Sequence, residues 1–167
     1  MTLEELLASR DARVARQREL LEAYPGLSLV CLTVQLPGQV KRNEVSLKIA
    51  EAGVEAVRAA FGVEYEELLD LETGFEGYFT VPDSTLEAKR RACLIEDTHP
   101  MGRLMDIDVI DRSGDLVSPV GRDSLGLPPR KCLLCDRPAR ECMRSRAHST
   151  EDLLAKIEEM VNDYMNL

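Results

Sequence analysis

The sequence predicts an α+β protein built as a single domain. Apolar runs of strand length alternate with segments whose apolar residues recur at helical spacing, in the order strand, helix, strand, strand, helix, strand. Capping boxes and glycine-containing turns mark where these elements begin and end. This βαββαβ order is typical of a ferredoxin-like, palm-like sheet, and 167 residues are enough for one domain with a sizeable core. Additional helices are expected at both ends, with a Cys/Arg-rich loop before the last one.

The first half of the chain contains the N-terminal helix and three of the four core strands. Thr2 and Glu5 form a capping box, and the helix that they begin is expected to fill residues 1–24. The α+β core is expected to occupy 27–120. Its first part is predicted to be an apolar central strand, an amphipathic helix and a hairpin that turns at Thr73-Gly74, over 27–36, 43–61, 63–71 and 75–81.

The second half of the core begins at another capping box, Ser84-x-x-Glu87. A helix, a strand and a short final strand are predicted over 84–97, 104–110 and 116–120. In the βαββαβ arrangement the first and fourth strands pair at the centre of the sheet, so 104–110 is expected beside 27–36. The rest of the chain is predicted to be a basic Cys-rich loop and a C-terminal helix, over 121–148 and 149–167.

Composition excludes several classes of protein. A net charge of −9 argues against a general binder of nucleic acid or of acidic membranes. No apolar run reaches membrane-spanning length, and the chain has neither a P-loop motif nor a Gly-x-Gly-x-x-Gly motif. Five cysteines, an odd number, and no hydrophobic leader indicate a reducing compartment, so we expect a cytoplasmic protein.

The strand over 104–110 carries the strongest candidate for chemistry. Asp106 and Asp108 are two residues apart, so both carboxylates are expected on one face of the strand. Carboxylates that close repel each other unless a cation lies between them. Mg²⁺ that also binds phosphate oxygens is the usual solution, and Arg103 at the start of the strand is suited to a further phosphate oxygen. The alternative interpretation is a solvated strand face that ends in a hairpin.

A basic segment follows near the C-terminus. Between Arg130 and His148 there are six basic and two acidic residues, a local charge of +4 in a chain of −9. Concentrated positive charge on an acidic protein suits a compact polyanion such as a polyphosphate. A mobile basic loop that offsets the acidic helices is the alternative.

The same segment contains three thiols and an imidazole at short spacings. Cys132, Cys135, Cys142 and His148 are a candidate tetrahedral Zn²⁺ site, which would order a loop that has little core of its own. The alternative is that these are ordinary reduced thiols, which pack as small apolar side chains.

Four motifs follow one another along the chain, SRDARVARQ at 9–17, PGQVK at 37–41, HPMGRLMDIDV at 99–109 and LPPRKCLLC at 127–135. In this order they resemble those of the citrate lyase holo-acyl-carrier-protein synthase family, whose members are also called apo-citrate lyase phosphoribosyl-dephospho-CoA transferases. The resemblance spans nearly the whole chain. It implies a nucleotidyltransferase reaction between 2′-(5″-triphosphoribosyl)-3′-dephospho-CoA and a serine of the acyl carrier (γ) subunit of citrate lyase, with release of pyrophosphate.

The resemblance, read together with the residue chemistry, suggests roles for individual side chains. Asp106 and Asp108 are expected to hold Mg²⁺, and Arg103 is the third candidate catalytic residue. The Asp-x-Asp also resembles the metal-binding half of the polymerase-β-like nucleotidyltransferase pattern, without the Gly-Ser that normally precedes it. The cations expected to bind the phosphates of the substrate are Lys41, Arg130, Arg16, Arg13 and Arg144.

Two other functions stay open at this point. The first is the analogous transferase for malonate decarboxylase, which would use the same donor on another carrier protein. The second is a non-catalytic, zinc-stabilised module that binds an acidic carrier protein through its basic loop. Mass measurement of a carrier protein after incubation with donor and Mg²⁺ separates an enzyme from a binding module.

Overall fold

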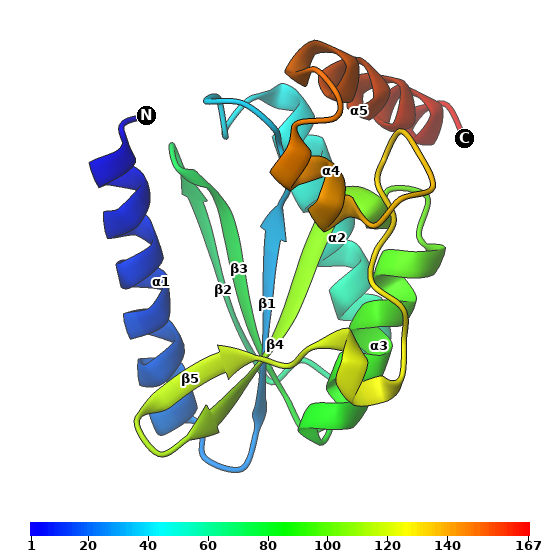
Figure 1. Ribbon diagram of the computed structural model, residues 1–167. Coiled ribbons are helices and arrows are strands. Elements are labelled where there is room, and N and C mark those ends of the chain that lie inside the picture. The colour runs from blue at the N-terminus through cyan, green and yellow to red at the C-terminus, as the bar shows by residue number, and fades with distance from the viewer.

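A computed structural model describes residues 1–167, and its centre is a five-stranded antiparallel sheet (Figure 1). The strands lie in the order β2-β3-β1-β4-β5. Their bounds are β1 Ser28–Val34, β2 Tyr65–Leu71, β3 Gly74–Val81, β4 Met105–Ser113 and β5 Leu116–Pro119. This confirms the α+β class, and it confirms that the first strand pairs with the strand that carries the two aspartates.

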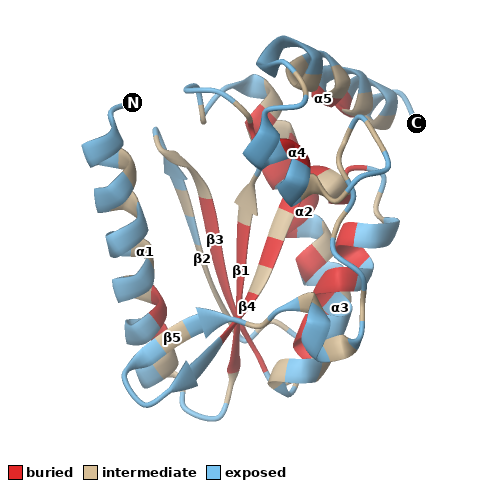
Figure 2. Ribbon diagram, viewed as in Figure 1, coloured by how far each residue is buried: buried red, intermediate tan, exposed pale blue.

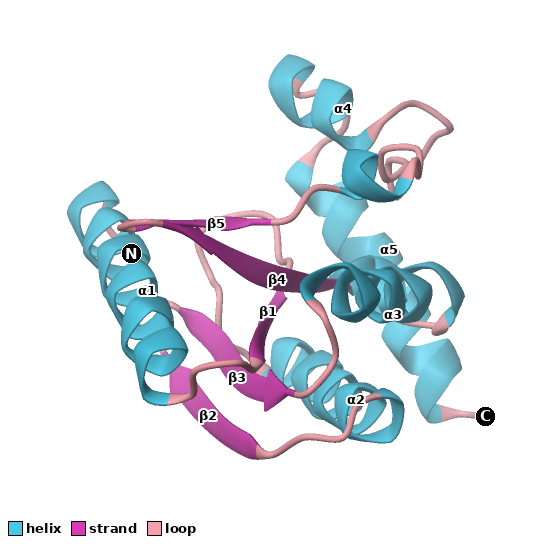
Figure 3. Cartoon of the chain, turned by 90° about the horizontal axis from the view of Figure 1, so that it is seen from below, coloured by secondary structure: helices cyan, strands magenta, loops and turns pink.

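Five α-helices cover the sheet unevenly. They are α1 Leu3–Ala23, α2 Glu44–Ala60, α3 Thr85–Thr98, α4 Ala139–Ser145 and α5 Thr150–Met165. Figure 3 shows α1 alone on one side of the sheet, with α2, α3 and α5 on the other side. The two faces therefore differ, because one face is sealed by several helices while the other is covered by a single helix. None of these helices combines the length and the hydropathy that a membrane span requires.

The core follows from the alternation of side chains along the strands. The larger cluster joins α2, α3 and α5 to one face of the sheet and includes Val30, Phe79 and Ile107. A smaller cluster under α1 includes Leu29 and Tyr78. Because β1 contributes to both clusters, its first five residues are buried in succession (Figure 2). This explains why its sequence reads as an unbroken apolar run.

The helix starts follow the predicted caps. Thr2 accepts a hydrogen bond from the backbone of Glu5, whose side chain accepts one from the Thr2 backbone. At α3 the Ser84 hydroxyl accepts a hydrogen bond from the Glu87 backbone, but the Glu87 side chain does not accept one in return, so only half of the predicted capping box forms. Each cap satisfies a backbone N–H that the first turn of a helix leaves unpaired.

One predicted segment differs from the structure. The residues expected to form only a loop, 121–148, include a 3₁₀ turn at Arg122–Leu125 and the helix α4. Helix α4 has seven residues, of which only Cys142 is buried. A helix this short has no repeating apolar stripe, so its periodicity cannot be seen in the sequence.

Candidate active site

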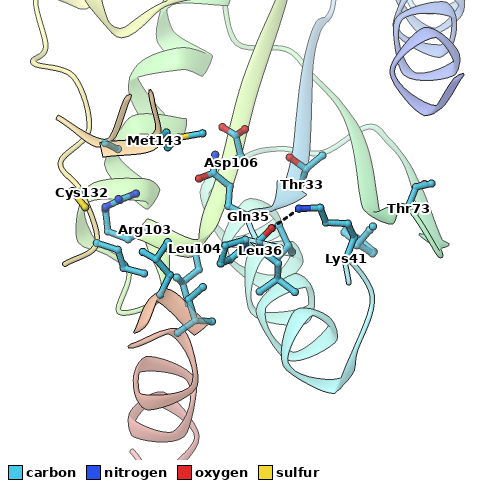
Figure 4. Close-up of a pocket in the computed structure, with 18 of the residues that line it drawn as sticks. Thr33, Gln35, Leu36, Lys41, Thr73, Arg103, Leu104, Asp106, Cys132 and Met143 are labelled. Carbon is cyan, nitrogen blue, oxygen red and sulfur yellow. Dashed lines mark hydrogen bonds between the residues drawn. The ribbon is translucent and has the colours of Figure 1, made fainter. Parts of the chain in front are cut away.

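A cavity of about 430 Å³ lies where the end of β1 and the start of β4 meet α1 and the Cys-rich segment. Residues from the first half of α1, the end of β1, the start of β4 and the Thr73-Gly74 turn form part of its wall. The rest of the wall comes from the loop after β1, which includes Lys41, from the 3₁₀ turn Gly102–Leu104, from the Cys-rich segment and from α5. In Figure 4, Asp106 and Thr33 lie on neighbouring strands between Arg103 on one side and Lys41 on the other. A cavity of this size and composition is suited to a small-molecule ligand.

Asp106 and Asp108 are on the face of the sheet that carries this cavity. In the ladder between β1 and β4, Asp106 is opposite Thr33 and Asp108 is opposite Cys31. The residues between and beside them point into the core on the other face. Asp106 lines the cavity, whereas Asp108 lies deeper and is not part of the lining. Burial, together with the charge of Asp106, raises the pKa of Asp108 to about 6. The pair therefore carries an unfavourable negative charge that a bound cation would relieve.

The cavity is strongly cationic apart from this carboxylate. Asp106 is the one acidic side chain in the lining, and the four Lys and Arg side chains there are Arg10, Arg13, Lys41 and Arg103. Arg103 is half-buried, and its pKa is lowered by burial and by the positive charge of Arg130. Its guanidinium has no hydrogen bond or ion pair within the protein. A partly desolvated, unpaired guanidinium of this kind is suited to bind phosphate.

Two of the other cations contact protein oxygens, one through a hydrogen bond and one through a longer ion pair. Lys41 Nζ donates a hydrogen bond of 2.6 Å to the backbone oxygen of Leu36, and burial lowers the pKa of Lys41. Arg13 Nε lies 3.7 Å from Glu76 Oε2 and has no hydrogen-bond partner although it is buried. Glu76 in turn accepts a 2.6 Å hydrogen bond from the hydroxyl of Tyr78. These contacts fix where the two positive charges lie.

Arg10 and Glu76 are the residues that sequence reasoning missed. Arg10 lies three positions before Arg13 on α1, so both side chains point to the same face of the helix. That spacing was a usable signal for Arg10. Glu76 carried no such signal, because its contact with Arg13 depends on the packing of α1 against the sheet.

Charged side chains replace a neighbouring strand along the outer edge of β4. Strand β5 pairs with β4 only from Ile110 onward. Before that point, Ile107 N donates to Glu96 Oε2 at 2.9 Å, and Ile107 O accepts from Lys89 Nζ at 3.5 Å. Arg130 donates to the backbone oxygens of Met105 at 3.0 Å and Gly102 at 2.8 Å. These bonds satisfy an otherwise exposed edge and hold the segment that carries both aspartates and Arg103.

Close packing of the 3₁₀ turn Gly102–Leu104 also fixes the position of Arg103. A Cβ on Gly102 would lie 2.4 Å from the backbone oxygens of Ile95 and Glu96. Those oxygens belong to α3 and cannot move aside as a flexible side chain would. Only glycine therefore permits this approach between the turn and the helix.

Three predicted substrate-binding cations lie outside the cavity lining. Arg130 is committed to Glu96 and to backbone oxygens, and Arg16 forms ion pairs with Glu67 and Glu19. Arg144 is exposed on α4. The guanidinium of Arg16 and the two terminal nitrogens of Arg130 already contact protein acceptors, whereas Arg130 Nε is buried without a hydrogen-bond partner. The phosphate-binding roles of all three residues stay predictions. We assign Arg130 to positioning β4 and Arg16 to attaching α1 to β2.

The four predicted metal ligands come together in the structure. One ligand atom from each of Cys132, Cys135, Cys142 and His148 lies within 4.8 Å of all the others, and the Sγ atoms of Cys135 and Cys142 are 3.5 Å apart. His148 Nε2 is buried without a hydrogen-bond partner. Three thiols and an orphaned imidazole nitrogen form a donor set that fits a tetrahedral metal ion. The cluster also contributes to the cavity wall.

Comparison with known proteins finds one family, and the similarity covers nearly the whole chain. The family model described as apo-citrate lyase phosphoribosyl-dephospho-CoA transferase matches residues 1–164. A protein of Vibrio cholerae serotype O1 strain M66-2, named probable apo-citrate lyase phosphoribosyl-dephospho-CoA transferase, is 41% identical over 170 residues, covering 98% of this chain and 93% of that protein. An Escherichia coli O1:K1 / APEC protein with the same name, without "probable", is 38% identical over 168 residues, covering 98% of this chain and 90% of its own.

Proposed function

The chain belongs to the apo-citrate lyase phosphoribosyl-dephospho-CoA transferase family, and we propose that its cavity is where the prosthetic group is transferred to apo-citrate lyase. The donor is 2′-(5″-triphosphoribosyl)-3′-dephospho-CoA, and the acceptor is a serine hydroxyl of the acyl carrier subunit. A phosphodiester forms at the serine and pyrophosphate leaves. The observation that carries this proposal is the cavity lining, in which four cations surround one carboxylate.

The cations bind and orient the triphosphate of the donor. Arg103 has all its donors free for phosphate oxygens, and Arg10 and Arg13 approach from α1 on the other side of the cavity. Lys41 adds a fixed positive charge near the Thr73-Gly74 turn. Charge developing on the leaving pyrophosphate is thereby stabilised by groups that need no rearrangement. Positioning and charge stabilisation supply most of the acceleration in phosphoryl and nucleotidyl transfer.

Asp106 and Asp108 are suited to hold Mg²⁺, because both lie on one face of the sheet, and burial together with the charge of Asp106 raises the pKa of Asp108. When bound, Mg²⁺ would neutralise charge on the donor phosphates. Asp106 is the carboxylate that faces the donor, and Asp108 supports it from the deeper position. We also assign the core to the ferredoxin-like, palm-like class, because β1 and β4 pair at its centre.

A transfer assay tests this function. The protein is incubated with donor, Mg²⁺ and the apo form of the citrate lyase carrier subunit, and the carrier is weighed by mass spectrometry. We expect the mass of the carrier to rise by that of the prosthetic group, and a carrier that lacks the acceptor serine to stay unchanged. Transfer to the malonate decarboxylase carrier instead would change the assigned acceptor. A complex that forms without added mass would contradict catalysis.

We further propose that the Cys-His cluster binds one structural Zn²⁺ ion. Its four donors fit zinc in number and type, and the segment around it has little apolar core beyond Cys142. Metal ligation would therefore supply much of the energy that orders this part of the cavity wall.

Metal analysis of the purified protein tests the zinc proposal directly. We expect about one zinc per chain, lost in Cys135→Ser, with a fall of roughly 3 kcal/mol in the free energy of unfolding. The matched control is Cys93→Ser, which changes a buried cysteine outside the cluster and should keep the metal. Wild-type protein purified without zinc, and unable to take it up, would contradict the proposal.

A further inference from the structure

The positive charges that have no carboxylate partner are concentrated in one part of the molecule. Eleven of the 21 Lys and Arg residues form ion pairs. Of the other ten, Arg18 and Lys89 donate to backbone oxygens. Three more line the cavity, namely Arg10, Lys41 and Arg103. The last five are Lys131, Arg137, Arg140, Arg144 and Arg146, which we call the α4 patch.

The α4 patch is on the surface and borders the opening of the cavity. All five of its residues are exposed. Their chain neighbours Cys132, Ala139, Cys142 and Met143 line the cavity, and Figure 4 shows Cys132 and Met143 on the same side as Arg103. Met143 is 75% exposed, which offers an apolar contact among the charges. The patch is therefore placed to touch whatever approaches the opening.

We propose that the α4 patch binds an acidic face of the acceptor protein and holds its serine at the opening of the cavity. This inference rests on the proposed function. The donor's phosphates already have four cations inside the cavity, so a second set outside it suits a second, larger anionic partner. The segment from Arg130 to His148, which contains the patch, has a net charge of +4, while the whole chain has a net charge of −9. An acidic protein would be repelled by most of this surface and attracted at the patch, which orients it toward the cavity.

Charge reversal at the patch tests this assignment. In Lys131→Glu/Arg140→Glu we expect the KM for the apo-carrier protein to rise at least tenfold, while the Kd for the donor and the kcat stay near the wild-type values. Raising the salt concentration should increase the wild-type KM for the carrier and have less effect on the variant, because its attractive charges are gone. Neither residue ligates the predicted metal or lines the cavity.

Lys48→Glu/Arg90→Glu is the matched control. It makes the same change in net charge on α2 and α3, and we expect it to leave the KM for the carrier unchanged. Unchanged carrier KM in the patch variant would overturn the inference, and so would a weakened donor Kd with normal carrier KM. If wild-type protein transfers nothing, the proposed function fails. Direct binding of the carrier to the two variants then still tests the patch, with equal affinity refuting it.

Discussion

Replacing Asp106 with Asn is expected to lower the transfer rate by about 10²–10³-fold while leaving the protein folded. The carboxylate is the only one in the lining of a cavity that is otherwise cationic. Its removal takes away the proposed Mg²⁺ ligand nearest the donor and a charge fixed in position for the transition state, and single losses of this kind cost roughly 10²–10³-fold. The rate of mass increase on the carrier protein measures the effect.

The fold should tolerate this substitution. Asp106 is half-buried and forms no hydrogen bond or ion pair through its side chain, so the neutral amide leaves no protein partner unsatisfied. Asp111→Asn is the matched control, because Asp111 is exposed on the same strand beyond the cavity. We expect this control to transfer at the wild-type rate. Near-normal transfer by Asp106→Asn, with an unchanged urea midpoint, would refute the role of Asp106.

Replacing Asp108 with Asn is expected to abolish transfer and at the same time to stabilise the protein at neutral pH. In the folded state the pKa of Asp108 is raised from 3.8 to about 6 by burial and by Asp106. The folded state therefore binds the proton more tightly than the unfolded state, and wild-type stability falls as the pH rises from about 4 to above 6. A pKa shift of this size corresponds to a loss of roughly 1–3 kcal/mol in the free energy of unfolding of the wild type when Asp108 ionises. Asn cannot ionise, so the variant does not lose this stability.

Urea unfolding in buffer free of divalent cations measures this difference. At pH 7.5 we expect Asp108→Asn to be more stable than wild type by about 1–3 kcal/mol, and at pH 4 the two should be nearly equal. Added Mg²⁺ should narrow the gap by stabilising only the wild type. A variant less stable than wild type at both pH values would show that ionised Asp108 supports the fold instead of straining it.

Local patterns in the sequence were sufficient for most of the fold. Capping residues such as Thr2 and Ser84 located helix starts, and the unbroken apolar run of β1 identified the central strand. The spacing of two residues placed both aspartates on one face, and the β1–β4 pairing placed them beside Thr33 and Cys31. The short spacings of the Cys-His motif correctly brought four ligands together. Each of these inferences depends on residues close together in the sequence, or on the order of the strands.

The parts that sequence reasoning missed depend on contacts between distant segments. Arg130 is predicted to bind phosphate, but the sequence did not reveal its protein partners, because Glu96 and Met105 lie in α3 and β4 and no local pattern pairs them with it. In the sequence Lys89 and Glu96 have no feature that sets them apart from other charged helix residues, yet both are buried against the edge of β4. Tertiary packing therefore decides which cations face the cavity and which ones bind other parts of the protein. The guanidinium of Arg103 has no protein partner, and the nearby backbone oxygens of Gly102 and Met105 accept hydrogen bonds from Arg130 instead.

Binding of Mn²⁺ in the presence of donor is the most direct test of the account. Mn²⁺ replaces Mg²⁺ at oxygen-rich sites and can be followed by electron paramagnetic resonance. We expect wild-type protein and Asp111→Asn to bind one Mn²⁺ per chain when donor is present, and Asp106→Asn to lose this binding. Equal binding by all three proteins would contradict the claim that the two carboxylates share a cation in this cavity.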